Sequence, residues 1–279
     1  MSPIDNSPSV PWWRWPNVMA LDAPAIALVW QRVIAAPAVP TWGESSALFF
    51  AVWAVYVADR LLDGRALRSL ATEELPLRHQ FFRTHRRRLI FLFCVALAGG
   101  AVSAAFLPAS IIWRGVALAA GVGLYLLWNQ VGVAAPARKW LKEVAVAGIF
   151  GVGCGLGSLG VVPLQAWLVA VVALAVCGWL NCLQIAALEC EFDRRSGMPS
   201  LAAKPKFERL IFDLLPWALA AGFFILVAVM GVSAATVCGL VGVMMLGATG
   251  RIGRRHGPEV GGAWADAAVF FPALVVCVI

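Results

Sequence analysis

Long apolar segments recur along this chain of 279 residues, and they constrain its fold more than any other feature. Hydropathy predicts about nine of them. They cover approximately residues 20–38, 44–61, 88–107, 111–130, 142–160, 163–187, 208–230, 233–250 and 264–279. Because hydrocarbon offers the backbone no hydrogen-bond partners, such segments cross a bilayer as helices. With 61% hydrophobic and 13% charged residues, the chain is predicted to be an all-α, polytopic membrane protein.

The basic residues lie almost entirely in alternate loops. The loops after the second, fourth, sixth and eighth segments hold most of the 22 Lys and Arg residues, whereas the odd-numbered loops hold only Arg114. The positive-inside rule therefore places the N-terminus and the even-numbered loops in the cytoplasm and the C-terminus outside. We expect residues 1–19 to form an N-terminal cytoplasmic or interfacial segment and residues 20–279 a single transmembrane domain. The net charge of +7 follows from this topology and does not indicate nucleic-acid binding.

Two short acidic strings, Asp59–Asp63 and Glu189–Asp193, lie where the second and sixth apolar segments end. In each string two carboxylates are four residues apart, about one helical turn, so we expect both to point the same way. Carboxylates are costly near a bilayer, and their oxygens are the ligands that hold Mg²⁺ against a phosphorylated substrate. The residues predicted to bind magnesium and diphosphate are Asp59, Asp63, Glu189 and Asp193, with Glu191 as a further ligand. The alternative for the first string is that Asp59 and Asp63 form ion pairs with the surrounding arginines and anchor a helix end.

Cations near the strings could neutralise a departing diphosphate. Arg60 lies inside the first string, and Lys139 and Lys142 follow the fourth apolar segment. Positive-inside topology alone would also place lysines there, so this assignment has an equally simple alternative. Trp53 and Tyr56 precede Asp63 on the same segment and are candidates for lining a channel for a prenyl chain.

The motif Asp59-Arg60-x-x-Asp63-Gly64, the acidic pair after the sixth segment, the lysines after the fourth and the nine segments together resemble the UbiA superfamily of intramembrane prenyltransferases. The resemblance implies a helical ring around a central cavity, use of Mg²⁺, and transfer of an isoprenoid group from its diphosphate to an acceptor. The chain departs from the usual family pattern at three positions. It has Val55 where the family usually has Asn, Cys182 where an Asp is often found, and Glu189 where the second motif usually begins with Asp.

We therefore expect a Mg²⁺-dependent prenyltransferase, a transferase of alkyl groups other than methyl, embedded in the membrane. Its partners would be a prenyl diphosphate, an unidentified lipophilic acceptor such as an aromatic ring, and the lipid bilayer, with no nucleic acid. One alternative is a terpene cyclase or diphosphate lyase of the same architecture. Others are a non-catalytic membrane protein that retains the fold and, ranked last, a transporter.

Overall fold

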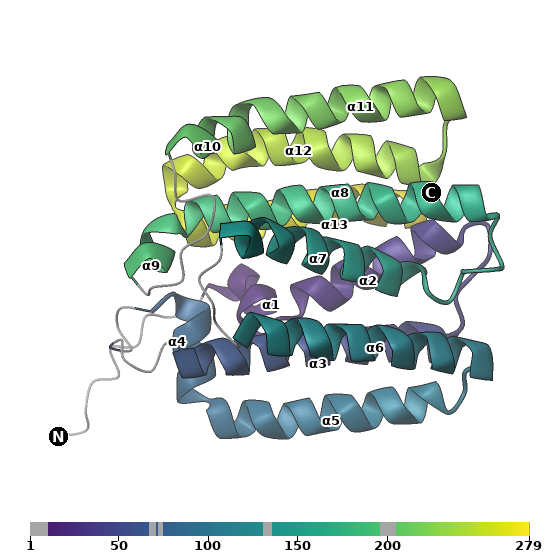
Figure 1. Ribbon diagram of the computed structural model, residues 1–279, viewed down its shortest axis with the longest axis horizontal. Helices are drawn as coiled ribbons and strands as arrows, with labels where there is room; N and C mark the ends of the chain where they lie inside the picture. Colours follow the sequence, from purple (N-terminus) through teal and green to yellow (C-terminus); the bar gives the residue numbers. More distant parts are fainter. Residues whose placement is uncertain (1–10, 67–70, 72–74, 131–135, 196–204, 279) are drawn as a thin grey trace.

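The computed structural model describes residues 11–66, 71, 75–130, 136–195 and 205–278, and within them the chain is built from helices that run side by side (Figure 1). The long helices are α2 (Asp22–Ala35), α3 (Trp42–Ala66), α5 (Arg86–Ala104), α6 (Ala109–Gln130), α7 (Pro136–Gly155), α8 (Leu164–Leu188), α11 (Leu215–Met230), α12 (Ala234–His256) and α13 (Pro258–Val278). The short ones are α1 (Trp15–Val18), α4 (Leu77–Thr84), α9 (Cys190–Arg195) and α10 (Pro205–Arg209), with a 3₁₀ turn at Trp12–Arg14 and a π-helical turn at Leu210–Leu214.

The predicted all-α membrane fold is confirmed. Seven helices in the described part of the chain are long and apolar enough to cross a bilayer: α3, α5, α6, α8, the stretch from α10 through α11, α12 and α13. The bent pair formed by residues 12–18 and α2 is an eighth candidate. The 20-residue helix α7 runs beside them. The long helices of the described residues therefore roughly match the nine predicted segments, although α7 is not among the candidate spans.

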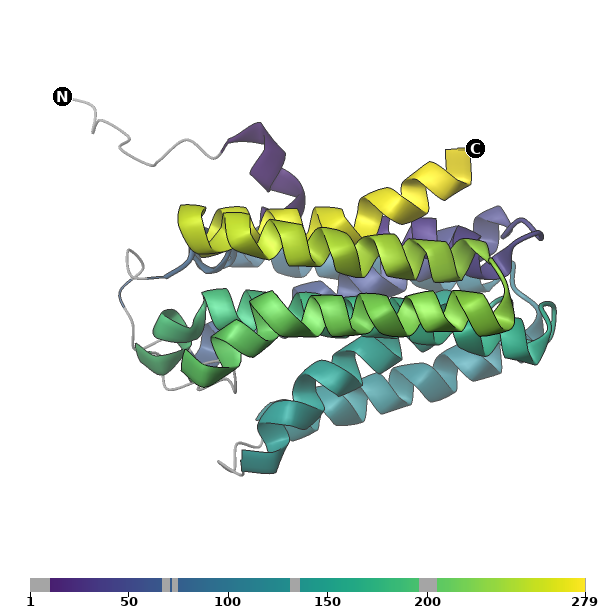
Figure 2. The same cartoon turned by 90° about the horizontal axis from the view of Figure 1, so that it is seen from above.

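The first predicted segment, 20–38, is not one continuous helix. Residues 12–18 meet α2 at an angle of 82°, so the beginning of the described chain projects away from the bundle (Figure 2). Ala20, between them, has a φ of 56°, which a helix does not accept. The 14 residues of α2 span only about 21 Å. The segment is therefore a broken element, shorter than the hydrocarbon layer of about 30 Å.

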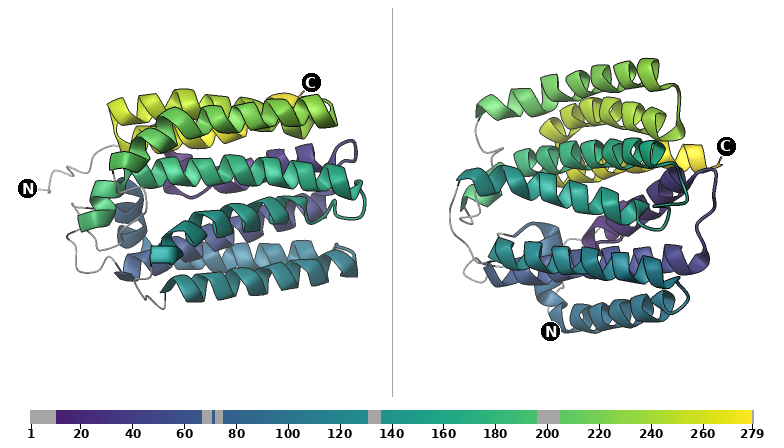
Figure 3. Two further views of the ribbon diagram at one scale, coloured as in Figure 1. Left: turned by 45° about the horizontal axis from the view of Figure 1, so that its top comes forward. Right: turned by 45° about the vertical axis from the view of Figure 1, so that its right-hand side comes forward.

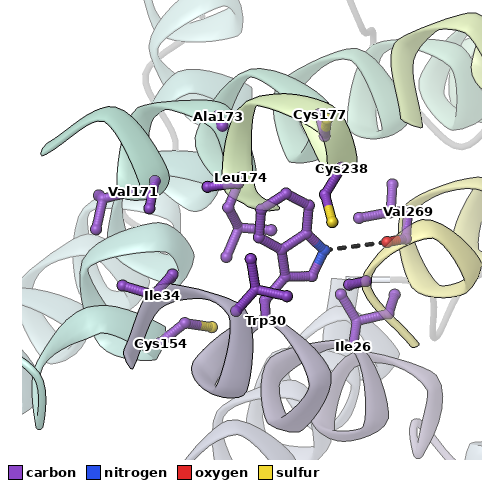
Figure 4. Packing of buried hydrophobic residues seen from close by; sticks show 14 of the residues in the cluster. Ile26, Trp30, Ile34, Cys154, Val171, Ala173, Leu174, Cys177, Cys238 and Val269 are labelled. Atoms are coloured by element: carbon purple, nitrogen blue, oxygen red, sulfur yellow. Dashed lines mark hydrogen bonds between the residues drawn. The ribbon is translucent and has the colours of Figure 1, made fainter. Parts of the chain in front are cut away.

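Trp30 marks the centre of the main hydrophobic core, where α2 packs against α8, α12 and α13 (Figure 4). Its side chain is fully buried, and its indole Nε1 donates a hydrogen bond of 3.0 Å to the carbonyl oxygen of Val269. A buried indole N–H needs such a partner, because no water is at hand to replace it. This bond fixes the short α2 against α13.

Helices α12 and α13 approach each other through glycine. A Cβ atom on Gly253 would lie 2.8 Å from the Cα of Gly261, and the side chain of Leu188 at the end of α8 fills the space beside both. Small residues at such crossings let backbones pack closely where lipid gives no hydrophobic drive for helix association. The end of α8 is therefore positioned by two glycines from elsewhere in the chain.

One end of the bundle gathers the elements that position the candidate site. The ends of α3 and α8 lie there together with the short helices α4, α9 and α10, as the different views agree (Figures 1 and 3). This is the end that the basic loops predict to be cytoplasmic, and the sidedness stays a prediction.

Candidate active site

The first acidic string lies on an unbroken helix. Helix α3 continues through Asp59 and Asp63 to Ala66, so the two carboxylates share one helical face as predicted. The charges that act on Asp63 are the carboxylate of Asp59 and the cations of Lys142, Arg60 and Arg78. Helices α3, α4 and α7 thus bring opposite charges together around the first string.

The second acidic string is built differently. Helix α8 ends at Leu188 and α9 begins at Cys190, with Glu189 between them at φ −92° and ψ 3°. The continuous helical turn that the spacing predicted is therefore wrong for this string, and its spacing alone does not fix how Glu189 and Asp193 point. Glu189 forms an ion pair with Arg78 of α4, and both side chains are largely buried.

Another acidic residue of the second string, Glu191, has a different partner. Glu191 accepts a hydrogen bond of 2.9 Å from Nε of Arg195, and both side chains are mostly exposed. Asp193 belongs to α9, but its side chain lies outside the described residues, as does that of Lys139 on α7. Lys142 is described, and its charge acts on Asp63.

Helix α4 joins the two strings. Arg78 contacts Glu189 and also acts electrostatically on Asp63 and Arg60. The next residue, His79, stacks on Phe192 of α9 with ring centroids 6.1 Å apart. Burial, and then the charges of neighbouring arginines, lower the pKa of His79 to about 2, so this ring is neutral. Glu189 of the second string and the carboxylates of the first therefore share one cluster of mixed charge.

A polar network that the sequence analysis missed lies beside Tyr56. The Asn17 amide donates to Asp22 at 2.8 Å and to Asp266 at 3.4 Å. Asn181 donates to the other oxygen of Asp266 at 2.9 Å. An Asp in the last apolar segment and an Asn in the sixth were the available signals, because polar groups at membrane depth are by default functional.

The two aromatic candidates face different surroundings. The hydroxyl of Tyr56 is within electrostatic range of Asp59 and of the pair Asp22 and Asp266, so Tyr56 lies between the first acidic string and the polar network. Trp53 instead donates a hydrogen bond of 3.1 Å from its indole to the carbonyl oxygen of Met19. Trp53 therefore helps to hold the junction before α2.

The described residues offer a limited set of ligands for a magnesium ion. Among them, no three His, Cys, Asp or Glu side chains lie close enough together to hold a metal by themselves. Mg²⁺, however, is commonly held by one or two carboxylates together with substrate phosphates and water. The same-face pair Asp59 and Asp63, with its hard oxygen donors, fits that mode of binding.

Comparison with known proteins gives a match in structure alone. No protein-family model and no curated protein sequence matches the chain. It is similar to the apo structure of a UbiA homolog from Aeropyrum pernix K1, with a TM-score of 0.62 and 16% identity over 94% of this chain and 99% of that one. It is also similar to a structure described under the biosynthesis of digeranylgeranylglyceryl phosphate synthase in membranes, with a TM-score of 0.51 and 13% identity over 95% and 96%. The chain therefore has the fold of UbiA-type membrane proteins, which is the fold that the resemblance in its sequence implied.

Proposed function

We propose that this protein is an intramembrane prenyltransferase, which moves an isoprenoid group from a prenyl diphosphate to a lipophilic acceptor. The observation that carries the proposal is the cluster at one end of the bundle, where carboxylates of two helix ends meet the cations Arg60, Arg78 and Lys142. Such a cluster suits a polyanionic head group, and the apolar helices behind it suit a hydrocarbon tail. The likeness to UbiA-type structures supports it.

The head group would be held by both strings. Asp59, Asp63, Glu189 and Asp193 are the proposed ligands of Mg²⁺, with Glu191 as a further one, and Arg60, Lys139 and Lys142 would contact the diphosphate. When bound, Mg²⁺ supplies positive charge that stabilises the leaving diphosphate. The bond from the allylic carbon to the diphosphate oxygen breaks with both electrons on the oxygen, and the arginines and lysines stabilise that charge. The acceptor then bonds to the allylic carbon and loses a proton.

The tail would lie among the apolar helices, with Tyr56 near its head. Tyr56 lies between Asp59 and the polar network of Asn17, Asp22, Asp266 and Asn181. Aromatic faces attract cations, and exclusion of water keeps an allylic cation from being quenched. An aromatic side chain at this position suits both demands.

Product analysis tests the proposal. The full chain, purified in detergent, is incubated with prenyl diphosphates of several lengths, with and without lipophilic acceptors, and the products are identified by mass spectrometry. A prenylated acceptor that depends on Mg²⁺ and is lost in Asp59→Ala supports a transferase. Diphosphate release with a hydrocarbon or alcohol product and no use of acceptor supports the lyase or cyclase alternative. A wild-type protein that binds no diphosphate would leave the non-catalytic alternative.

A further inference from the structure

We infer that Arg78 is a diphosphate-binding residue, which the substrate-free protein holds in reserve against Glu189. The inference rests on the proposed function and assigns a new role within the same site. In it, Arg78 exchanges one anionic partner, the Glu189 carboxylate, for another, a diphosphate oxygen.

Arg78 lies close to charged residues of both acidic strings. It stands in the first turn of α4, outside the membrane helices, and reaches the end of α8 to pair with Glu189. The side chains of Arg78 and Glu189 are only 19% and 13% exposed, so the pair is poorly screened by solvent. The same guanidinium acts on Asp63 of the first string. Arg78 therefore lies where a head group held by both strings would lie.

The guanidinium of Arg78 also has unused hydrogen-bonding capacity. Nε of Arg78 is buried and has no hydrogen-bond partner among the described residues. A buried donor without a partner is uncommon and often marks a functional position. A guanidinium is a planar fork of donors that can bind two phosphate oxygens at once. A diphosphate beside Arg78 would satisfy the donor that the substrate-free protein leaves unmet.

Helix α4 does not depend on the ion pair between Arg78 and Glu189 for its position. His79 stacks on Phe192, and Phe81 packs edge to face with Trp15 at a centroid distance of 5.7 Å. The backbone N–H of Leu77 also donates to Glu259 at 3.2 Å. Arg78 can therefore change partner while α4 remains in place.

The charges of Glu189 and the diphosphate determine when Arg78 changes partner. While it is paired with Arg78, Glu189 has its negative charge already compensated and is a poor ligand for a cation. A diphosphate adds negative charge beside Arg78 and so competes with Glu189 for the guanidinium. Glu189 is freed for a cation only in the presence of the substrate. The substitution of the usual Asp by Glu189 supplies the longer side chain that meets Arg78.

Binding of inorganic pyrophosphate to the full chain in detergent tests the inference, measured by isothermal titration calorimetry with and without Mg²⁺. Arg78→Gln should weaken binding about tenfold or more, the loss expected for one hydrogen bond to a charged group. Glu189→Gln should act in the opposite direction without Mg²⁺, tightening binding at least about threefold, because it releases Arg78. Addition of Mg²⁺ should raise the affinity of Glu189→Gln for pyrophosphate by less than it raises the affinity of the wild type.

Arg83→Gln is the matched control, since it removes the same charge from the same helix. Arg83 lines a separate, basic pocket of about 560 Å³ with Thr84, His85 and the arginines that begin α5. The affinity of Arg83→Gln for pyrophosphate should stay within about twofold of wild type, because Arg83 lines this separate pocket and is not part of the ion pair between Arg78 and Glu189. Thermal unfolding of every variant establishes that it folds, and Arg78→Lys, which keeps the charge without the fork, should fall between Arg78→Gln and wild type.

The inference predicts that Arg78→Gln and Glu189→Gln change the affinity for pyrophosphate in opposite directions. If Arg78→Gln and Glu189→Gln both weaken binding equally, the ion pair is structural and the inference fails. It also fails if Arg78→Gln binds as tightly as wild type, while the proposed function stands. If the folded wild type binds no pyrophosphate even with Mg²⁺, the proposed function fails and takes the inference with it.

Discussion

The two acidic strings have the same spacing of carboxylates but different surroundings. In the first, α3 runs without a break through Asp59 and Asp63, and the carboxylates stay on one face. In the second, the helix breaks at Glu189, which pairs with Arg78, while Glu191 turns to Arg195 on the exposed side. Equal spacing thus gives a charged face in one string and separate ion pairs in the other. The difference comes from tertiary packing at the end of α8.

The contacts around the break explain its position. Leu188, the last residue of α8, packs against the glycines where α12 and α13 cross. Phe192, four residues later, stacks on His79. Between two such anchors the chain follows the packing and not the straight helix, because tertiary contacts outweigh local propensity.

The largest effect should come from the first string. Asp63→Asn removes one of two carboxylates on the α3 face and should lower prenyl transfer on the order of 100-fold, the size associated with loss of one electrostatic contact to the reacting group. The rate of acceptor prenylation at saturating diphosphate measures it. Prenyl transfer within a few fold of wild type would show that the first string is not the metal-binding one. The comparison between the two acidic strings would then be reversed.

Gly261→Ala should disturb the second string through the helix behind it. The added methyl group would collide with Leu188 and with the backbone of α12 at Gly253, and overpacking of this kind costs about 1–3 kcal/mol. Gly262→Ala is the control, because a Cβ there meets no atom within 4 Å. Thermal unfolding in detergent compares the two. Equal melting temperatures would mean that α12 and α13 yield easily and do not fix the end of α8.

Acid should weaken the docking of α4 on the second string. His79 is held neutral in the folded protein, with a pKa of about 2, whereas in the unfolded chain it takes up a proton near pH 6.5. The unfolded state therefore binds more protons below pH 6.5, and the free energy of unfolding falls as the pH is lowered from 7 to 5, by about 2 kcal/mol. His79→Phe keeps a ring on Phe192 and should lose this part of the pH dependence in unfolding measurements. His85→Phe is the control, and an identical loss there would contradict the assignment.

The smallest effect should come from Glu191→Gln. Its ion pair with Arg195 is mostly exposed, and such pairs contribute about 0.5 kcal/mol or less. The melting temperature should therefore change little, and because Glu191 is only a further ligand beside four others, the Mg²⁺ concentration needed for prenyl transfer should rise only slightly. A marked rise would make Glu191 a principal metal ligand and would give the second string more metal ligands than the first.

The sequence was sufficient to predict the membrane-spanning segments but not the contacts between residues that are far apart in the chain. The apolar segments and the shared face of Asp59 and Asp63 followed from length, composition and helical spacing. The pairing of Arg78 with Glu189 joins residues 111 positions apart, and that of Asn181 with Asp266 joins residues 85 apart. No local pattern carries such contacts. The break at Ala20 was likewise hidden, because an alanine gives no sign of a positive φ.

The short α2 bears on how the protein is assembled during synthesis. A helix of about 21 Å with Asp22 at its start is a poor candidate for independent insertion into lipid. Its stable position depends on the hydrogen bond from Trp30 to Val269, and Val269 belongs to α13, which is synthesised long after α2. We therefore expect α2 to reach its final position only after α13 has been synthesised, so that termination before α13 would leave an open, protease-sensitive chain.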